Sequence, residues 1–220
     1  MKFKLVILVF FVLVISGCQE QNITNDASQE TPTIVAKEND SILVDNNNDG
    51  MSRRQGEYDS QVHGKLVVNP NYYIENKIQR GDVIYYKLPK VYKIKFPRVN
   101  APEFGISRVI ALPGELVQIK KGQIYINEKR LNTFYGKMSS WGENEKEFFS
   151  TINEPGTAIC DEVCQKNMKD FFNMNVGKFE VPVNQLYVLG DTGWRSIDSN
   201  IHGPVPITNI IGKVIGYAEK

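Results

Sequence analysis

The chain has 220 residues and nearly balanced charge, because 26 lysines and arginines against 25 aspartates and glutamates give a formal net charge of +1. The basic residues are spread along the sequence, so nothing indicates a nucleic-acid-binding surface. A chain of this length is typical of one domain, or of one domain carrying an insertion, once an N-terminal signal and linker are set aside.

The N-terminus has the pattern of an export signal. Two lysines precede an unbroken apolar run over residues 5–15, and small residues then lead to Cys18. The run is shorter than the roughly 20 apolar residues that a membrane span needs. Residues 15–18, Ile-Ser-Gly-Cys, resemble the bacterial lipobox, in which the cysteine is acylated and becomes the first mature residue. The sequence predicts a lipoprotein signal peptide over 1–18 with lipidation at Cys18; an ordinary signal peptide or an uncleaved anchor is the alternative.

Residues 19–40 are polar, with almost no apolar clustering. Such a segment cannot bury a core, so we expect a flexible tether. A lipid on Cys18 would hold the following domain, residues 41–220, at the extracytoplasmic face of a bacterial cell membrane.

The chain contains three cysteines, Cys18, Cys160 and Cys164. If Cys18 carries lipid, the other two form an even pair in an exported, oxidising setting, and a Cys160–Cys164 disulfide is the favoured interpretation. Zinc is less favoured, because no second CxxC or paired histidines complete four ligands. We expect neither a metal nor another cofactor.

From residue 41 onward, apolar residues mostly alternate or form short runs rich in β-branched and aromatic types. Gly and Pro turns separate the runs, and Lys120-Lys121-Gly122 is a hairpin signal. This pattern predicts a mainly β, antiparallel fold, sheet-on-sheet or barrel-like. The predicted strands are residues 41–44, 65–68, 82–86, 107–112, 116–119, 123–126, 185–189 and 210–217.

Residues 132–178 interrupt this rhythm. They are polar, with aromatic clusters and a possible short helix at 160–172. We expect an insertion or subdomain there.

Five segments carry short motifs in a fixed order. They are residues 80–84 (RGDVI), 107–115 (SRVIALPGE), 123–127 (QIYIN), 181–191 (VPVNQLYVLGD) and 190–205 (GDTGWRSIDSNIHGPV). Together they resemble the type I signal peptidases, the serine–lysine endopeptidases of the S26 family. The resemblance implies that family's mostly antiparallel β fold, with a variable insertion after the hairpin. It also implies an ancestral activity, the cleavage of exported preproteins at the outer membrane face.

The chemistry of that family needs a serine nucleophile and a neutral lysine as general base, whose pKa burial has lowered. The resemblance places Ser107 at the lysine position, next to Arg108, and a hydroxyl cannot act as a base near neutral pH. Ser196 matches the serine that orients the lysine, and Asp198 belongs to the same motif.

The nucleophile is expected within residues 45–64. The nearest match to the family's S-M-x-P-T motif puts Gly50 at serine and Met51 at methionine, with no P-T after them, whereas a gapless count lands near Gln55. Ser52 is the nearest hydroxyl and a weak nucleophile candidate.

Other catalytic sets are conceivable. His63 could serve as a base for Ser52 or Ser60, since histidine titrates in the right range. Ser196, Asp198 and His202 supply triad chemistry on paper, but they lie within seven residues, whereas triads are normally assembled from separated elements.

Asp198 lacks the arginine that usually follows it in the motif, because that position is Asn200. Arg108 or Arg195 could replace it, and such an arginine–carboxylate fork would be structural.

These features favour a degenerate member that binds exported preproteins or other extended peptides along a strand edge and modulates secretion. The competing hypotheses are a working endopeptidase, with Ser52 as nucleophile and a substitute base such as His63, and an extracytoplasmic domain with an unrelated binding role.

Overall fold

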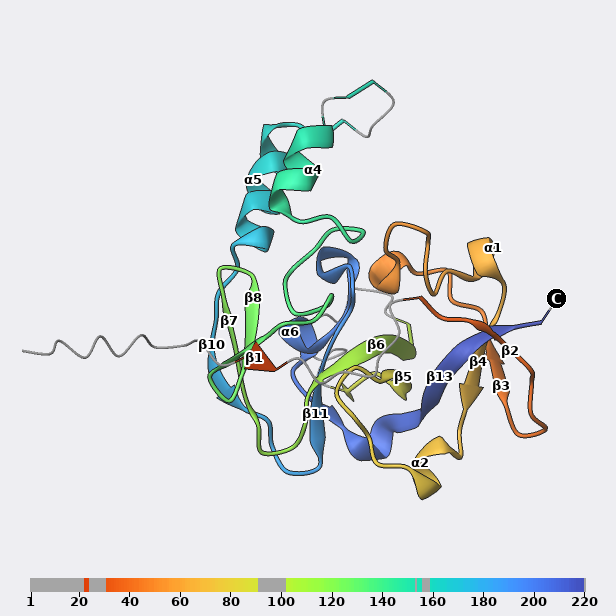
Figure 1. Ribbon diagram of the computed structural model, residues 1–220. Helices are drawn as coiled ribbons and strands as arrows, with labels where there is room; N and C mark the ends of the chain where they lie inside the picture. Colours follow the sequence, from red (N-terminus) through yellow and green to blue (C-terminus); the bar gives the residue numbers. More distant parts are fainter. Residues whose placement is uncertain (1–21, 24–30, 91–101, 153, 156–158, 220) are drawn as a thin grey trace, which may run out of the picture.

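The structure is a computed structural model that describes residues 22–23, 31–90, 102–152, 154–155 and 159–219. Two β-sheets form most of it, and Figure 1 shows helices α4 and α5 standing beyond one end of the smaller sheet. Within the described residues the strand pairs are antiparallel except for two short N-terminal pairings. The predicted mainly β, antiparallel fold is confirmed.

The larger sheet has eight described strands in the order β12-β11-β6-β5-β13-β4-β3, with β2 pairing β13. Its central strands are apolar on both faces and buried. The strands are β2 (Ile34–Val35), β3 (Ile42–Val44), β4 (Leu66–Asn69), β5 (Val83–Lys87), β6 (Phe104–Ala111), β11 (Gln185–Leu189), β12 (Val205–Pro206) and β13 (Ile210–Ala218).

The smaller sheet has the order β1-β9-β8-β7-β10. Its inner face packs against Tyr187 and Leu189 of β11, so the two sheets share one apolar core. Its strands are β1 (Asn22–Ile23), β7 (Leu116–Lys120), β8 (Gln123–Ile126), β9 (Lys129–Leu131) and β10 (Val176–Glu180).

The helices are short, and within the described residues none is long and apolar enough to cross a membrane. The α-helices are α1 (Ser60–His63), α2 (Tyr72–Glu75), α4 (Glu145–Thr151), α5 (Glu162–Phe172) and α6 (Ser199–His202). The 3-10 helices are η1 (Asp49–Met51), η2 (Gly193–Arg195) and η3 (Ile207–Asn209).

Each of the eight strands predicted from residue 41 onward overlaps an observed strand. The predicted hairpin is confirmed: β7 and β8 are joined by Lys121 and Gly122, with φ of 46° and 72°. Positive φ at both positions is what a two-residue hairpin of this handedness requires. Prediction missed β9, β10 and β12, which are short or rich in charged residues.

Part of the segment expected to be a tether, residues 19–40, is paired in the structure. β1 joins β9, and β2 joins the end of β13, where Tyr217 N donates to Thr33 O at 2.9 Å. The reason for the second pairing is that β5 covers only residues 210–213 of β13. The far end of β13 therefore has an open edge, which the β-branched residues of β2 fill.

The expected insertion, residues 132–178, contains α4 and α5, and its last residues belong to β10. Asn144 and Glu147 form a capping box at the start of α4, and Asp161 caps α5 through Cys164 N. The helix expected at 160–172 corresponds to α5.

Candidate functional site

A cleft of about 410 Å³ opens between the chain around η1 and the N-terminal half of β6. Its lining combines backbone, amide, carboxylate and apolar groups and includes Ser196. The lining residues are Val44, Asp45, Asn46, Asn47, Asn48, Gly50, Met51, Tyr85, Leu88, Pro102, Glu103, Phe104, Gly105, Ile106, Ser196 and Ile197. The motif residues Gly50, Met51 and Ser196 are thus brought together at one cleft, although 146 positions separate Gly50 from Ser196.

Gly50 lies in η1, which Asn48 caps by accepting a hydrogen bond from Gly50 N at 2.7 Å. The Ser196 hydroxyl contacts the carbonyl oxygens of Gly50 (2.9 Å) and Thr192 (3.2 Å). Gly190 lies against the same group, because a Cβ there would stand 1.6 Å from Ser196 Oγ and 2.5 Å from Gly50 O. Ser196 is therefore clamped between two glycine backbones and its proton is committed to carbonyl acceptors.

Ser107 is buried in β6 and its hydroxyl lies 3.2 Å from the Tyr86 hydroxyl. Tyr86 OH in turn lies 3.4 Å from Nε2 of His202, whose Nδ1 is 2.7 Å from Gly203 O. Burial raises the pKa of Tyr86, so the phenol stays neutral. The position that the resemblance assigns to a lysine is filled by a neutral hydroxyl network. Sequence reasoning missed Tyr86, which it placed only as a strand residue.

Arg108 and Asp191 form a buried fork, with each side chain only 1% exposed. Nε donates to Oδ1 at 2.8 Å and Nη2 to Oδ2 at 2.6 Å, while Nη1 donates to Gly81 O at 2.9 Å. A bidentate, charge-assisted pair of this kind fixes both partners. The fork joins β6 to the chain directly after β11 and so anchors the start of the 190–199 loop to the sheet.

The two partners predicted for Asp198 are wrong. Arg108 binds Asp191, and Arg195 binds Asp49 at 2.9 Å. Asp198 instead caps α6, accepting from Asn200 N at 3.0 Å and from Gly190 N at 3.1 Å. Burial raises its pKa to about 7, although both backbone N–H groups lower it. The Asp198 carboxylate is buried at the start of α6, and no ion pair joins it to an arginine among the described residues.

Ser52 lies directly after η1 and is only 3% exposed. Its hydroxyl has no hydrogen-bond partner among the described residues, and Ser52 is not part of the cleft lining. His63 lies on α1, where its Nε2 is 2.8 Å from Gln55 O and its ring stacks on Tyr217. Ser60 on the same helix accepts from Asn46 N at 2.8 Å. His63 is engaged with Gln55 and Tyr217, the Ser52 hydroxyl has no described hydrogen-bond partner, and neither residue lines the cleft.

Ser196, Asp198 and His202 also point to different partners. Ser196 bonds to carbonyl oxygens, Asp198 to backbone N–H groups, and His202 to Tyr86. These hydrogen bonds do not link the three residues into the serine–histidine–aspartate chain that triad chemistry requires.

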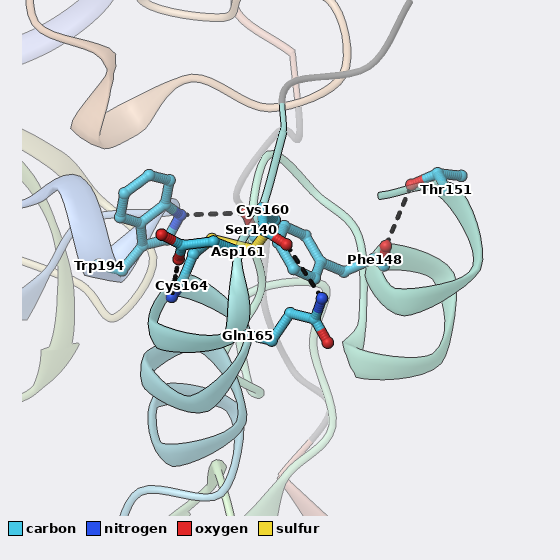
Figure 2. The surroundings of a disulfide bond; sticks show 8 residues. All are labelled: Ser140, Phe148, Thr151, Cys160, Asp161, Cys164, Gln165 and Trp194. Atoms are coloured by element: carbon cyan, nitrogen blue, oxygen red, sulfur yellow. Dashed lines mark hydrogen bonds between the residues drawn. A yellow bond between two sulfur atoms is a disulfide. The ribbon is translucent and has the colours of Figure 1, made fainter. Parts of the chain in front are cut away.

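Cys160 and Cys164 are joined in a disulfide at the first turn of α5. Figure 2 shows this bridge with Asp161 bonded to Cys164 N and Gln165 to Cys160 O. The insertion also contacts the cleft loop: Trp194 Nε1 donates to Ser140 Oγ at 3.0 Å, and the Trp194 ring meets Trp141 edge-on at 5.2 Å. The helical insertion is thus braced against the loop that holds Ser196.

Fold and site together define a class: a two-sheet, mainly antiparallel β domain with a cleft of about 410 Å³ between η1, β6 and the loop after β11. The family model described as "Signal peptidase, peptidase S26" matches residues 3–217. The chain belongs to this signal peptidase family.

Individual relatives agree with the family match. A signal peptidase I from Leptolyngbya laminosa is 30% identical over 155 residues, which cover 70% of this chain and 60% of that protein. A signal peptidase I from Rickettsia typhi is 30% identical over 148 residues, 61% of this chain and 50% of that protein. The chain therefore spans between half and three fifths of the length of these two relatives. Signal peptidase I V of Bacillus subtilis is 28% identical, covering 72% of this chain and 77% of that protein.

A crystal structure of a signal peptidase I from Enterococcus faecalis is also similar. It shares 22% identity with a TM-score of 0.38, and the match covers 63% of this chain and 97% of that chain.

The predicted lipidation site, Cys18, lies outside the described residues.

Proposed function

We propose that this family member binds extended segments of exported preproteins in its cleft without cleaving them. It does so at the outer membrane face, where a lipid on Cys18 holds it. The observation that carries the proposal is the presence of a glycine, Gly50, and a serine, Ser107, at the two positions that the family motifs assign to nucleophile and base.

The cleft lining supports the absence of cleavage. Among the described residues that line it there is no lysine and no histidine, and the only serine is Ser196. A serine hydroxyl is a poor nucleophile until a neighbouring base removes its proton. The Ser196 proton is directed toward the Gly50 and Thr192 carbonyl oxygens, neither of which is such a base.

The strand edges support peptide binding. β11 pairs with β6 only at residues 108, 109 and 111, so residues 104–107 have no strand partner on that side within the described part of the chain. Residues 104–106 line the cleft, as does Val44 at the end of β3, which is an edge strand among the described strands. An extended peptide can add its backbone hydrogen bonds to such an edge.

The test uses the mature protein purified from bacterial membranes and a fluorescent peptide spanning a preprotein cleavage region. Anisotropy measures binding and mass spectrometry detects cleavage. We expect saturable binding and an intact peptide after prolonged incubation. A peptide methylated on alternate backbone nitrogens should bind weakly, because it cannot pair with a strand edge.

Two matched variants localise the binding. Phe104→Ala removes a cleft ring that is 37% exposed, and Phe179→Ala removes a ring of β10, away from the cleft lining, that is 36% exposed. We expect about a tenfold loss of affinity for the first, since burying an aromatic ring contributes on the order of 1.5 kcal/mol, and little change for the second. Cleavage by the wild type that disappears in Ser196→Ala or Ser52→Ala would overturn the proposal.

Membrane anchoring has a separate test. Cells grown with labelled palmitate should label the wild-type chain and not Cys18→Ala. Label retained in the variant would refute lipidation at Cys18 while leaving the peptide-binding experiment intact.

A further inference from the structure

A basic surface lies on the smaller sheet, and none of its residues lines the cleft. It surrounds the β7–β8 hairpin and combines four exposed cationic side chains with Tyr125. We define the basic face as Lys120, Lys121, Arg130 and Lys137, which line one shallow depression together with Gln123, Tyr125 and Asn175. Among the described residues, this lining contains no acidic side chain.

The positive charge of the basic face is only partly offset within the described residues, where the Glu128 carboxylate interacts with the charge of Lys120. In the part of the chain that the structure describes, no ion pair joins any of its four cations to a carboxylate. Other exposed lysines do have such partners: Lys65 pairs with Asp45, Lys87 with Glu103, and Lys166 with Asp170. The nearby Glu128 is already paired with Lys178. The basic face therefore presents a surplus of positive charge to whatever approaches it.

The side chains of this face are held in place. Gln123 donates to the carbonyl oxygens of Leu131 and Gly136, and Arg130 Nε donates back to Gln123 Oε1 at 3.1 Å. The Lys120 ammonium lies 5.1 Å from the centre of the Tyr125 ring. An amphipathic tyrosine beneath basic side chains is suited to a membrane interface.

The pairing of β1 with β9 brings the N-terminal part of the chain next to the basic face. β1 pairs with β9 so that Asn22 is opposite Arg130 of the basic face. Cys18 lies four positions before Asn22 in the sequence, so their Cα atoms are at most about 14 Å apart. A lipid on Cys18 would hold the basic face close to the membrane surface, near the roughly 10 Å over which charges act at moderate salt.

We propose that the basic face docks on anionic phospholipid headgroups beside the lipid anchor and so fixes the orientation of the domain on the membrane. This inference rests on the proposed lipidation of Cys18 and not on peptide binding. Attraction of several lysines and arginines to an anionic bilayer is strong at low salt and is screened at high salt.

The test uses the lipidated mature protein reconstituted into two kinds of vesicle, one of phosphatidylcholine and one with about one third phosphatidylglycerol. A membrane-impermeant amine reagent labels exposed lysines, and mass spectrometry reads each site. We expect Lys120, Lys121 and Lys137 to label about fivefold more slowly on phosphatidylglycerol vesicles, with the difference lost in concentrated NaCl. The exposed helical lysines Lys146, Lys166 and Lys169 should label equally on both.

A second measurement uses variants. Solubilised protein offered both vesicle types should prefer those with phosphatidylglycerol, and the triple substitution Lys120→Gln, Lys121→Gln, Lys137→Gln should abolish the preference. The matched substitution Lys146→Gln, Lys166→Gln, Lys169→Gln should retain it.

Several outcomes would overturn the proposal. They are equal labelling of the basic face on both vesicles, protection by inorganic phosphate on phosphatidylcholine vesicles, and protection by polyglutamate that phosphatidylglycerol does not reproduce. An intact mass showing no acyl group on Cys18 would also overturn it, because the distance argument depends on the anchor. Failure of peptide binding alone would leave it standing.

Discussion

Ser196 occupies the space that a side chain on Gly50 would need. A Cβ atom on Gly50 would lie 2.8 Å from Ser196 Oγ and 3.2 Å from Ser196 Cα, both closer than ordinary contact. The space beside Gly50, the position that the motif match assigns to the nucleophile, is therefore already filled by Ser196. Restoring a serine there therefore does not by itself restore the geometry of a peptidase.

We expect Gly50→Ser to lower the free energy of unfolding by about 1–3 kcal/mol, because the added atoms overpack a filled site. Urea denaturation measures the loss. Gly177→Ser is the matched control, since nothing lies within 4 Å of a Cβ at Gly177, and it should change stability by less than about 0.5 kcal/mol. The double variant Gly50→Ser/Ser107→Lys should still leave a preprotein peptide uncut; efficient cleavage by it would show that the site is not closed.

The Arg108–Asp191 fork gives a second prediction. Arg108→Met leaves the Asp191 carboxylate buried without its guanidinium, and removing one partner of a buried pair costs about 3–5 kcal/mol. Asp191→Asn should cost a similar amount, and the double variant should cost much less than the sum of the two. Urea denaturation of the three variants measures this coupling. The exposed Lys166–Asp170 pair is the control, worth at most about 0.5 kcal/mol; additive losses at the fork would contradict strong coupling.

The sequence predicted strands correctly where the apolar pattern of a segment matches its burial in the folded sheet. Residues 186–189 of β11 form an apolar run because both faces of the strand are buried, and burial is what the pattern reports. β9 and β10 were missed because Lys129 and the exposed residues of β10 carry no such pattern. Their strand conformation comes from pairing with β8 and β7, which only the folded sheet supplies.

The sequence predicted several residues of the site correctly, but it did not predict which of them bind one another. Motifs located Arg108, Ser196 and Asp198, but the partner of Arg108 depends on the register between β6 and β11, where Leu189 lies opposite Arg108. That register brings Asp191, two residues further on, to the guanidinium. A one-residue slip would have changed the facing side chains, and no local signal fixes the register.

Asp198 gives a prediction about pH. Burial raises its pKa to about 7, above the value near 3.9 of an unfolded chain, so the folded state binds the proton more tightly. Stability from this group is therefore full below about pH 4 and falls as pH rises toward 7, with a slope of at most about 1.4 kcal/mol per pH unit. Asp198→Asn should remove this slope. His202 is present in both proteins, so the difference between their stability curves from pH 4 to 8 isolates Asp198; parallel curves would contradict the raised pKa.

The disulfide gives the last prediction. The native chain should show no free thiol at Cys160 or Cys164, and a count of two in the non-reduced protein would contradict the bridge. Because the bridge closes a loop of only about five residues, the chain-entropy relation assigns it about 2 kcal/mol, less than a bridge between distant segments. That loss should fall on α5, whose first turn the bridge holds, and hydrogen exchange should accelerate there after reduction. The double variant Cys160→Ser/Cys164→Ser is the control, because reductant should leave its exchange unchanged.

Trp194 contacts Ser140 and Trp141 of the insertion, so loosening of the insertion on reduction could reach the cleft through Trp194. In that case peptide affinity at the cleft should fall together with the hydrogen-exchange protection of the 190–199 loop. A loss of affinity without a loss of protection would exclude coupling through Trp194.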